Sequence, residues 1–309
     1  DDMKKDLLTI NDLTREEIER LLERSAWLKQ ARKDGVDHRP LAGKTLGMIF
    51  EKSSTRTRVS FEVGMYQLGG QALYLPAQDL QMGRGEPVAD TARTLSRYLD
   101  AIMIRTFSQS MVEELALHAG IPVVNGLTDL HHPCQALADL FTVRERRGSL
   151  AGLKLCYVGD GNNVAHSLIE ACAKVGMHIS LACPPGYEPD AAIMRTAKQS
   201  AAASRSDILL FSEPKKAAKG ADVLYTDVWA SMGQEKEQSQ RIKAFAGYQI
   251  DANLLREASP DAVVMHCLPA HRGEEISAEV IEGPRSVVFD QAENRLHTQK
   301  AVLEMLMAR

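Results

Sequence analysis

The stretch "TLGMIFEKSSTRTRVSFE", residues 45–62, joins an apolar run to a cluster of hydroxyl and guanidinium side chains. The apolar run predicts a buried strand, and a helix is expected from Thr55 to Leu68. In an open α/β sheet, ligands lie beyond the carboxyl ends of strands, and a helix beginning there offers free N–H groups to an anion. Ser54 and Arg56 would add side-chain donors at that place. Three interpretations remain open here: a solvated helix start, a nucleic-acid patch, or a socket for a small anion.

Short apolar runs alternate with helical patterns along the chain, which is typical of parallel sheets covered by helices on both faces. The first series has expected strands at 45–50, 71–77, 101–105 and 121–126, and expected helices from about 14 and at 55–68, 88–98, 111–119 and 134–147. The second series has expected strands at 153–159, 178–184, 207–212, 222–229, 262–269 and 286–290, and a last helix at about 297–309. A long polar insertion is expected at 231–249.

The turn-rich segment "RRGSLAG" (146–152) separates the two series. We therefore predict an α/β protein with two doubly wound domains, each a parallel sheet flanked by helices. The predicted boundaries are 1–148 for the first domain and 149–293 for the second, with 294–309 forming a C-terminal helix that packs back on the first domain.

Composition narrows the class of protein. The chain has 309 residues and a net charge of −4, so a general nucleic-acid binder is disfavoured and any anion recognition should be local. Five dispersed cysteines without a C-x-x-C pair favour a reducing compartment over a disulfide framework. The polar start predicts no signal peptide, and no apolar run approaches the roughly 20 residues that span a bilayer. We expect a cytoplasmic protein; a processed organelle-matrix form is not distinguished from it.

Two phosphate-binding motifs are incomplete. "LAGKT" (41–45) resembles a P-loop, but the required glycine five residues before Gly43 is replaced by His38. "VGDGNNVAHS" (158–167) begins like a dinucleotide fingerprint, yet Val164 replaces the third glycine. The next strand ends in Cys183-Pro184, where a ribose-binding acid would be needed. A dinucleotide oxidoreductase is therefore disfavoured.

Polar groups also follow other expected strands, in "AIMIR", "LHHPCQALADL", "DVWASMG" and "HCLPAHRGEEI". The motifs "SSTRTRVSFE", "HHPCQ" and "HCLPAHRGEE" closely resemble the carbamoyl-phosphate signatures of the aspartate and ornithine carbamoyltransferases. "DVWASMGQE" and "GDGNNVAHS" resemble the ornithine-binding segments of that family. The resemblance extends from the first helix to the "AENRLHTQKAVLEMLM" tail, so it covers nearly the whole chain.

The resemblance implies a carbamoyl transfer from carbamoyl phosphate to the δ-amine of L-ornithine, giving citrulline. It implies that carbamoyl phosphate contacts Ser54, Thr55, Arg56, Thr57, Arg105, His132, Gln135, Cys267, Leu268 and Arg295, with Gln81 reaching a neighbouring subunit's site. It implies ornithine contacts at Asn163, Asp227, Ser231 and Met232, and catalytic roles for Arg56, Arg105, His132 and Cys267. It also implies a cis Leu268–Pro269 bond and a homotrimer, or a multiple of trimers, with shared sites. Arg58 is expected to be more structural than ligand-facing.

Neither a cofactor nor a metal is expected, and no nucleic-acid or membrane partner. Aspartate as the acceptor would call for extra cations for its second carboxylate, and the segment around Asp227 lacks them. Putrescine has no carboxylate, and N-acetylated or N-succinylated ornithine would not need Asp227 as an ammonium partner. An anion-binding protein without turnover remains a separate alternative.

Overall fold

The computed structural model describes residues 5–231 and 234–308. The chain divides into two compact units, which are described separately here. Unit 1 comprises the chain up to Phe141 and from Glu293 onward, and unit 2 comprises Thr142–Ala292. The first division falls within helix α5 (Pro133–Arg147), a few residues before the turn-rich segment at 146–152.

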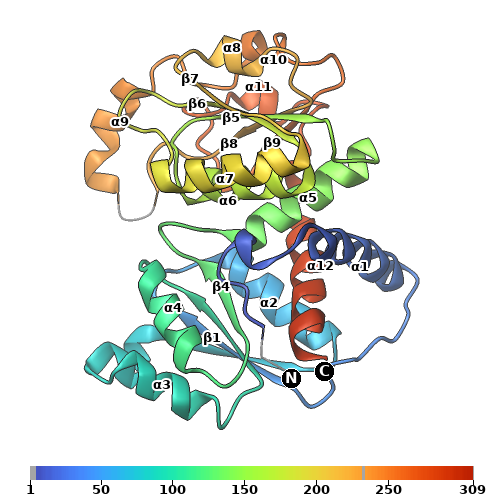
Figure 1. Ribbon diagram of the computed structural model, residues 1–309, viewed down its shortest axis with the longest axis vertical. Coiled ribbons are helices and arrows are strands. Elements are labelled where there is room, and N and C mark those ends of the chain that lie inside the picture. Colours follow the sequence, from blue (N-terminus) through green and yellow to red (C-terminus); the bar gives the residue numbers. More distant parts are fainter. Residues whose placement is uncertain (1–4, 232–233, 309) are drawn as a thin grey trace. The chain divides into compact units, whose positions relative to one another are not determined.

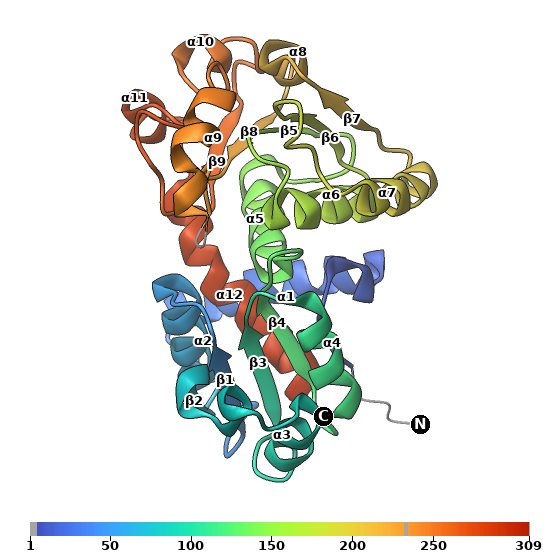
Figure 2. The same ribbon diagram turned by 90° about the vertical axis from the view of Figure 1, so that its left-hand side faces the viewer.

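Unit 1 is built on a four-stranded parallel sheet with the strand order β2-β1-β3-β4. Its strands are β1 (Thr45–Phe50), β2 (Gln71–Pro76), β3 (Ala101–Arg105) and β4 (Val123–Leu127). Its helices are α1 (Arg15–Lys33), α2 (Thr55–Gln67), α3 (Val88–Leu95) and α4 (Gln109–His118), with the 3-10 turns η1 (Ile10–Asp12), η2 (Ala77–Asp79) and η3 (Gln81–Arg84). Helices α3 and α4 cover one face of the sheet, and α2 with α12 (Val288–Met307) covers the other (Figures 1 and 2).

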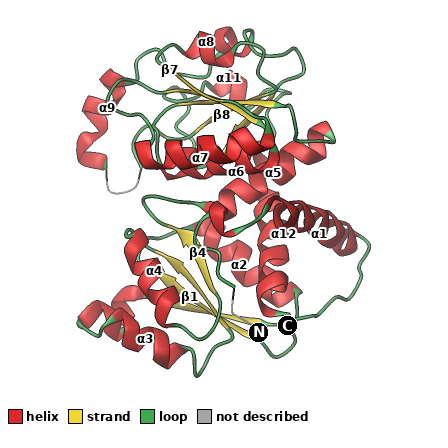
Figure 3. Ribbon diagram, in the orientation of Figure 1, coloured by secondary structure: helices red, strands yellow, loops and turns green. Residues whose placement is uncertain are grey.

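Unit 2 contains a five-stranded parallel sheet with the order β7-β6-β5-β8-β9. Its strands are β5 (Lys154–Val158), β6 (His178–Ala182), β7 (Ile208–Phe211), β8 (Val223–Thr226) and β9 (Val263–His266). Its remaining elements are α6 (Asn163–Val175), α7 (Ala191–Ser204), α8 (Pro214–Ala218), η4 (Glu235–Glu237), α9 (Gln238–Ala244), α10 (Ala252–Leu255) and α11 (Ala278–Ile281). Each sheet is flanked by helices on both faces (Figure 3), which confirms the predicted fold class.

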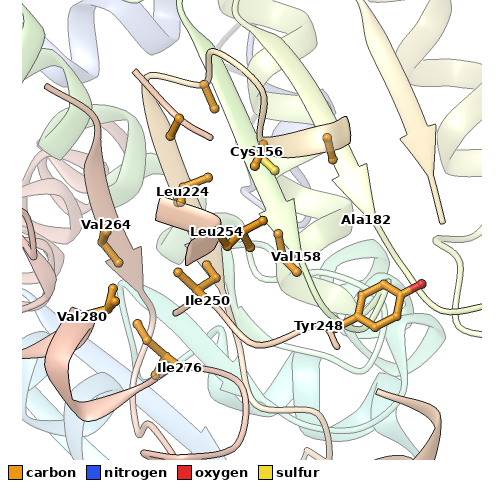
Figure 4. Packing of buried hydrophobic residues seen from close by; sticks show 14 of the residues in the cluster. Cys156, Val158, Ala182, Leu224, Tyr248, Ile250, Leu254, Val264, Ile276 and Val280 are labelled. Atoms are coloured by element: carbon orange, nitrogen blue, oxygen red, sulfur yellow. The ribbon is translucent and has the colours of Figure 1, made fainter. Parts of the chain in front are cut away.

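One hydrophobic cluster of unit 2 lies between its sheet and the helices α8, α10 and α11. Val158, Leu224 and Val264 project from three neighbouring strands and are fully buried. Leu254 and Val280 from the covering helices pack against them (Figure 4). Strands buried on both faces read as nearly continuous apolar runs, which is why the parallel sheet could be predicted from the sequence.

The last helix packs on unit 1, as predicted, but it begins earlier than expected. The Lys300 ammonium donates to the Gln67 side chain, and the Gln299 amide donates to Ser60, both on α2. The predicted strand at 286–290 is wrong: Ser286 forms only an isolated bridge to Val264, and α12 starts at Val288. A short apolar run of this kind does not distinguish a strand from a buried helix start.

The expected polar insertion at 231–249 is partly helical, because it contains η4 and α9. The buried residues Arg241 and Phe245 lie one helical turn apart in this segment. They anchor a segment whose surface positions are mostly polar.

Two positions after β5, Gly159 and Gly161, require glycine for steric reasons. Gly159 adopts φ 146°, a region that favours glycine. A Cβ atom on Gly161 would lie 2.3 Å from the backbone nitrogen of Pro189. The glycine pair that resembles a dinucleotide fingerprint is therefore accounted for by a tight turn packed against the chain near Pro189.

Gly161→Ala tests this packing. The added methyl group must displace backbone, so we expect a loss of about 1–3 kcal/mol of stability, seen as a melting temperature lower by several degrees. Gly120→Ala is the matched control, since its Cβ would meet only the Cβ of Ser96, at 3.9 Å. Equal melting temperatures for the two variants in differential scanning calorimetry would contradict the steric explanation.

Candidate active site: two groups of polar side chains at strand ends

In unit 1, polar side chains gather where β1, β3 and β4 end. Arg105 is the last residue of β3 and lies opposite Phe50, the last residue of β1. Helix α2 begins five residues after β1, and α5 begins shortly after β4, directly after His132. The carboxyl ends of parallel strands meet at one edge of a sheet, so the sequence distance between these segments is bridged by the strand register.

The start of α2 is capped by the motif that predicted it. Ser54 is the N-cap, and its hydroxyl accepts a hydrogen bond from the Thr57 N–H at 3.1 Å. Thr55 and Arg56 occupy the first two helical positions; Thr55 is exposed and Arg56 half-buried. Arg58 points elsewhere: it pairs with Glu62 at 3.4 Å, and its guanidinium lies 3.6 Å from the Tyr74 ring centroid.

Arg295 of α12 connects the start of α2 to α5. Its guanidinium is buried and donates to the Gln135 carbonyl oxygen at 2.8 Å and to the Thr57 hydroxyl at 3.2 Å. The Gln135 amide nitrogen donates to Asp139 at 2.9 Å. Gln299 accepts from Nε of Arg295 at 2.9 Å, so the guanidinium is fixed on three sides.

The charges in this region are mutually unfavourable. The pKa of Arg105 is lowered to about 10, mainly because the guanidinium is buried and secondly because of the positive charges of Arg295 and Arg56. In the part of the chain that the structure describes, neither the Arg56 nor the Arg105 guanidinium forms an ion pair, and Nε of Arg105 is buried without a hydrogen-bond partner. Three guanidinium groups at one edge of the sheet make this place a candidate site for a small anion.

His132 lies in the same cationic environment and is 5% exposed. Burial lowers its pKa well below the usual value, and the charges of Arg295, Arg105 and Arg56 lower it further. The imidazole is therefore neutral near pH 7, and it can act as a hydrogen-bonding group without adding a fourth positive charge.

In unit 2, Asp227 and Cys267 each directly follow one of two adjacent strands. Thr226 and His266, the last residues of β8 and β9, are register partners, so the two following side chains meet. The Cys267 thiol donates to Oδ1 of Asp227 at 3.0 Å. Asp227 is 6% exposed and, within residues 5–231 and 234–308, forms no ion pair. A buried carboxylate without a cation is costly, which makes Asp227 a candidate partner for a cationic ligand.

Asn162, which contacts Asp227, is a candidate site residue that the sequence did not reveal. Its amide nitrogen donates to Oδ2 of Asp227 at 2.8 Å, and its Oδ1 caps α6 by accepting from the Val164 and Ala165 N–H groups. An asparagine directly before a helix is fully explained by capping, so nothing in the sequence indicated its contact with Asp227. The predicted residue Asn163 is half-buried and begins α6 beside it.

A second buried carboxylate of this unit already has its cation. Asp160 accepts from the Arg241 guanidinium at 2.9 Å, and Arg241 also donates to the Trp229 carbonyl oxygen at 2.9 Å. Arg241 thereby ties α9 to the turn after β5. Asp227, by contrast, accepts from neutral donors among the described residues: the Asn162 amide, the Cys267 thiol and the Val228 N–H.

The structure gives the backbone conformation or the burial of three further predicted site residues, Leu268, Ser231 and Gln81. Leu268 has φ 59° and precedes a cis bond to Pro269, as predicted. Ser231 is half-buried, and its N–H donates to the Gln234 side chain at 2.9 Å. Met232 lies outside the described residues. Gln81 is exposed on η3, and its expected role concerns a neighbouring subunit.

Two groups of side chains within the described part of the chain have the chemistry of metal ligands: Asp227 with His266 and Cys267, and His271 with Glu274 and Glu275. In the first group, both ring nitrogens of His266 are already hydrogen-bonded, and the Cys267 thiol donates to Asp227. A cation at that place would have to replace these contacts. None of the described helices is both long and apolar enough to cross a membrane.

Comparison with known proteins agrees with both halves of this geometry. Residues 5–145 match the carbamoyl-phosphate-binding domain of the aspartate/ornithine carbamoyltransferases, and residues 151–306 match the aspartate/ornithine-binding domain. The chain is 59% identical to an ornithine carbamoyltransferase of Syntrophus aciditrophicus over 99% of this chain and 100% of that protein. It is 57% identical to the anabolic ornithine carbamoyltransferase of Pyrococcus furiosus, covering 98% of this chain and 96% of that protein.

A solved structure of ornithine carbamoyltransferase from Pyrococcus furiosus superposes with a TM-score of 0.96 at 57% identity, covering 98% of this chain and 97% of that one. The domain matches together span most of the sequence, and the similarity extends to the fold of both units. The chain therefore belongs to the aspartate/ornithine carbamoyltransferase family.

Proposed function

We propose that this chain transfers the carbamoyl group of carbamoyl phosphate to the δ-amine of L-ornithine, releasing citrulline and phosphate. The observation that carries the proposal is the cluster of Arg56, Arg105 and Arg295 at the sheet edge of the domain matched to carbamoyl-phosphate binding. Asp227 of the other domain supports it, because a buried carboxylate that forms no ion pair with any described residue suits the ammonium group of an amino acid.

The phosphate would be held at the start of α2. Ser54, Thr55, Arg56 and Thr57 supply N–H, hydroxyl and guanidinium donors around a helix N-terminus, which favours negative charge. The Thr57 hydroxyl oxygen accepts from Arg295, so its own proton remains available to a phosphate oxygen. Charge-assisted hydrogen bonds contribute roughly 1.5–3 kcal/mol each, so a few of them suffice for micromolar binding after ordering costs.

The carbamoyl end would meet Arg105, His132 and Gln135. The Gln135 carbonyl oxygen and one of its N–H groups are already used by Arg295 and Asp139, so a second amide N–H remains for the ligand. Neutral His132 can donate its ring N–H to the carbonyl oxygen without becoming a general acid. Arg105 and Arg56 then face the oxyanion of the tetrahedral intermediate, where fixed donors are worth most.

The carbamoyl transfer requires a neutral δ-amine as the nucleophile and an activated carbonyl group as its target. The δ-amine of free ornithine resembles lysine, with a pKa of about 10.4, so the site must favour its deprotonated form. Nearby cations and the backbone oxygens of Cys267 and Leu268 would do so, the oxygens by accepting from the amine. The amine nitrogen bonds to the carbamoyl carbon, the C–O bond to phosphate breaks, and the departing phosphate takes the amine proton. No side-chain nucleophile is required.

Ornithine itself would be held through Asp227 at its α-ammonium group, with Asn162 and Asn163 beside it. Ser231 and Met232 would contact its α-carboxylate and methylene chain. Aspartate fits this arrangement poorly, because its second carboxylate would need a cation, and Arg241 is already paired with Asp160. Ornithine is therefore the proposed acceptor.

The proposal extends to the assembly, the cellular compartment and the direction of the reaction. We propose a homotrimer, or a multiple of trimers, in which Gln81 reaches the phosphate site of a neighbour. The cytoplasm is the proposed location, since the five cysteines are free thiols dispersed along the chain. The name of the Pyrococcus furiosus relative favours the direction of arginine biosynthesis.

Arg56→Ala tests the electrostatic part of the mechanism. Removing one donor to a developing oxyanion typically lowers kcat by about 10²–10³, and we expect that loss in a citrulline assay with saturating substrates. Arg58→Ala is the matched control, because Arg58 belongs to the same motif but contacts Glu62 and Tyr74. A kcat for R56A close to that of R58A would contradict the proposed role.

Asp227→Asn tests recognition of the acceptor's α-ammonium group. We expect kcat/KM for ornithine to fall about 10²-fold or more, as when one partner of a buried charge pair is removed. 5-Aminovalerate keeps the δ-amine and carboxylate of ornithine but lacks the α-ammonium, so its lower kcat/KM should barely change. Asp261→Asn serves as a control, since Asp261 is 72% exposed and paired with Arg147. The idea fails if D227N loses equally against both amines.

The protonation of His132 can be checked by NMR titration of its labelled ring. Its lowered pKa predicts a neutral imidazole throughout pH 6–8, with no midpoint near the usual value of about 6.5. Below that value His132 is protonated in the unfolded chain but stays neutral in the folded chain, so the free energy of unfolding falls as the pH drops. The free energy of unfolding should therefore decline more steeply below pH 6.5 in the wild type than in His132→Gln. A ring midpoint at or above pH 6.5 would be inconsistent with this environment.

A further inference from the structure

Two residues of the "HCLPAHRGEE" motif have no role in the mechanism above, although they are its first and last members. His266 and Glu275 are nine positions apart in sequence and both are completely buried. Oε1 of Glu275 lies 2.7 Å from Nε2 of His266. Between them the chain carries Cys267 and Leu268, whose backbone oxygens are proposed to contact the reacting groups.

The hydrogen bonds of His266 define its tautomer. The backbone N–H of Leu268 donates to Nδ1 of His266 at 2.8 Å. An N–H group can only donate, so Nδ1 is the acceptor and the ring proton of the neutral imidazole is on Nε2. Nε2–H therefore donates to Glu275, and the donors form a directed chain of hydrogen bonds that runs from Leu268 through His266 to Glu275.

Leu268 is the residue that needs such support. Its φ of 59° lies in the left-handed region, which is unfavourable for a side chain branched or bulky enough to clash with the backbone. Backbone of this kind persists only where surrounding contacts fix it, and such positions gather at functional sites. The hydrogen bond to His266 is the contact that holds the Leu268 N–H.

The other end of the chain of hydrogen bonds is itself fixed. Oε1 of Glu275 also accepts from the His271 N–H at 2.8 Å, and the Ile250 N–H donates to the Glu275 backbone oxygen at 2.9 Å. The His266 N–H donates to Gln291 at 2.9 Å. Glu275 is thus anchored by its backbone and connected through one imidazole to the segment that follows β9.

We propose that Glu275 and His266 are positioning residues that hold the Cys267–Leu268 backbone so that its oxygens face the amine and the carbamoyl group. They act through Leu268 and do not touch substrate. This inference rests on the proposed carbamoyl transfer. Misplacement of reacting groups by about 1 Å can cost on the order of 10²-fold in rate. Loss of the hydrogen bonds from Leu268 through His266 to Glu275 should therefore lower kcat strongly, while the affinity for substrate changes less.

Paired substitutions at His266 separate positioning from general structure. His266→Asn places an oxygen near the position of Nδ1 and keeps an acceptor for the Leu268 N–H. His266→Gln instead keeps a donor near the position of Nε2 for Glu275 and removes that acceptor. We expect kcat to fall about 10- to 100-fold in H266Q. In H266N we expect a smaller fall, less than about 3- to 10-fold, because the acceptor for the Leu268 N–H is kept. The KM for carbamoyl phosphate should change less than threefold in both.

Glu275 provides the second pair. Oε2 of Glu275 has no hydrogen-bond partner in the described part of the chain, so an amide NH₂ can replace it while the carbonyl oxygen replaces Oε1. Glu275→Gln should therefore recover most of the activity that Glu275→Ala loses. Melting temperatures are measured for all four variants, and inorganic phosphate is titrated by calorimetry to report the arginine cluster independently.

The outcomes are distinguishable. Support consists of H266N exceeding H266Q in kcat, E275Q exceeding E275A, and phosphate affinity unchanged in variants that remain folded at the assay temperature. Equal kcat in H266N and H266Q, or losses that simply follow the melting temperature, would overturn the positioning role. A wild-type chain that forms no citrulline would refute the proposed function, independently of these comparisons.

Discussion

Three arginines of unit 1, Arg56, Arg105 and Arg295, lie close enough for their positive charges to repel one another. Arg295 and Arg56 both lower the pKa of buried Arg105, and all three arginines lower that of His132. Like charges in a poorly hydrated place remain unfavourable until an anion arrives. The folded chain without ligand therefore carries an electrostatic cost that a dianion removes. Binding at this place should stabilise the fold as well as organise the reaction, because a ligand that binds only the folded state shifts the equilibrium toward it.

Parallel sheets explain how such groups come together from distant sequence. Arg105 ends β3, while Asp227 and Cys267 directly follow β8 and β9. Strand register fixes the backbone at each of these positions, so the side chains that follow are placed by the rigid part of each unit. The arginine cluster thus depends on one sheet, and Asp227, the carboxylate proposed to bind the acceptor, depends on the other. Helix starts at Ser54 and Asn162 add polar groups without any further element.

Local pattern was sufficient for most of the fold and for part of the site. Apolar runs and the helical pattern after them predicted β1 and α2, and the donors at Ser54 and Arg56 made an anion socket one of three interpretations left open there. The run 286–290 misled, because a buried helix start and a short strand share the same composition. Arg295 could not be placed from periodicity, since only the packing of α12 brings it to Thr57 and Gln135; the family resemblance supplied it. The contact between His266 and Glu275 was missed for a related reason: it depends on the path of the intervening turn, which has no periodic signal.

The most direct test of this account is a crystal structure of the chain with carbamoyl phosphate bound. The account predicts the phosphate at the N-terminus of α2, with the Arg56 guanidinium within hydrogen-bonding distance of its oxygens and the carbonyl oxygen turned toward Arg105 and His132. A structure in which the ligand lies elsewhere, or in which the Arg56 guanidinium faces bulk solvent while the ligand is bound, would contradict it.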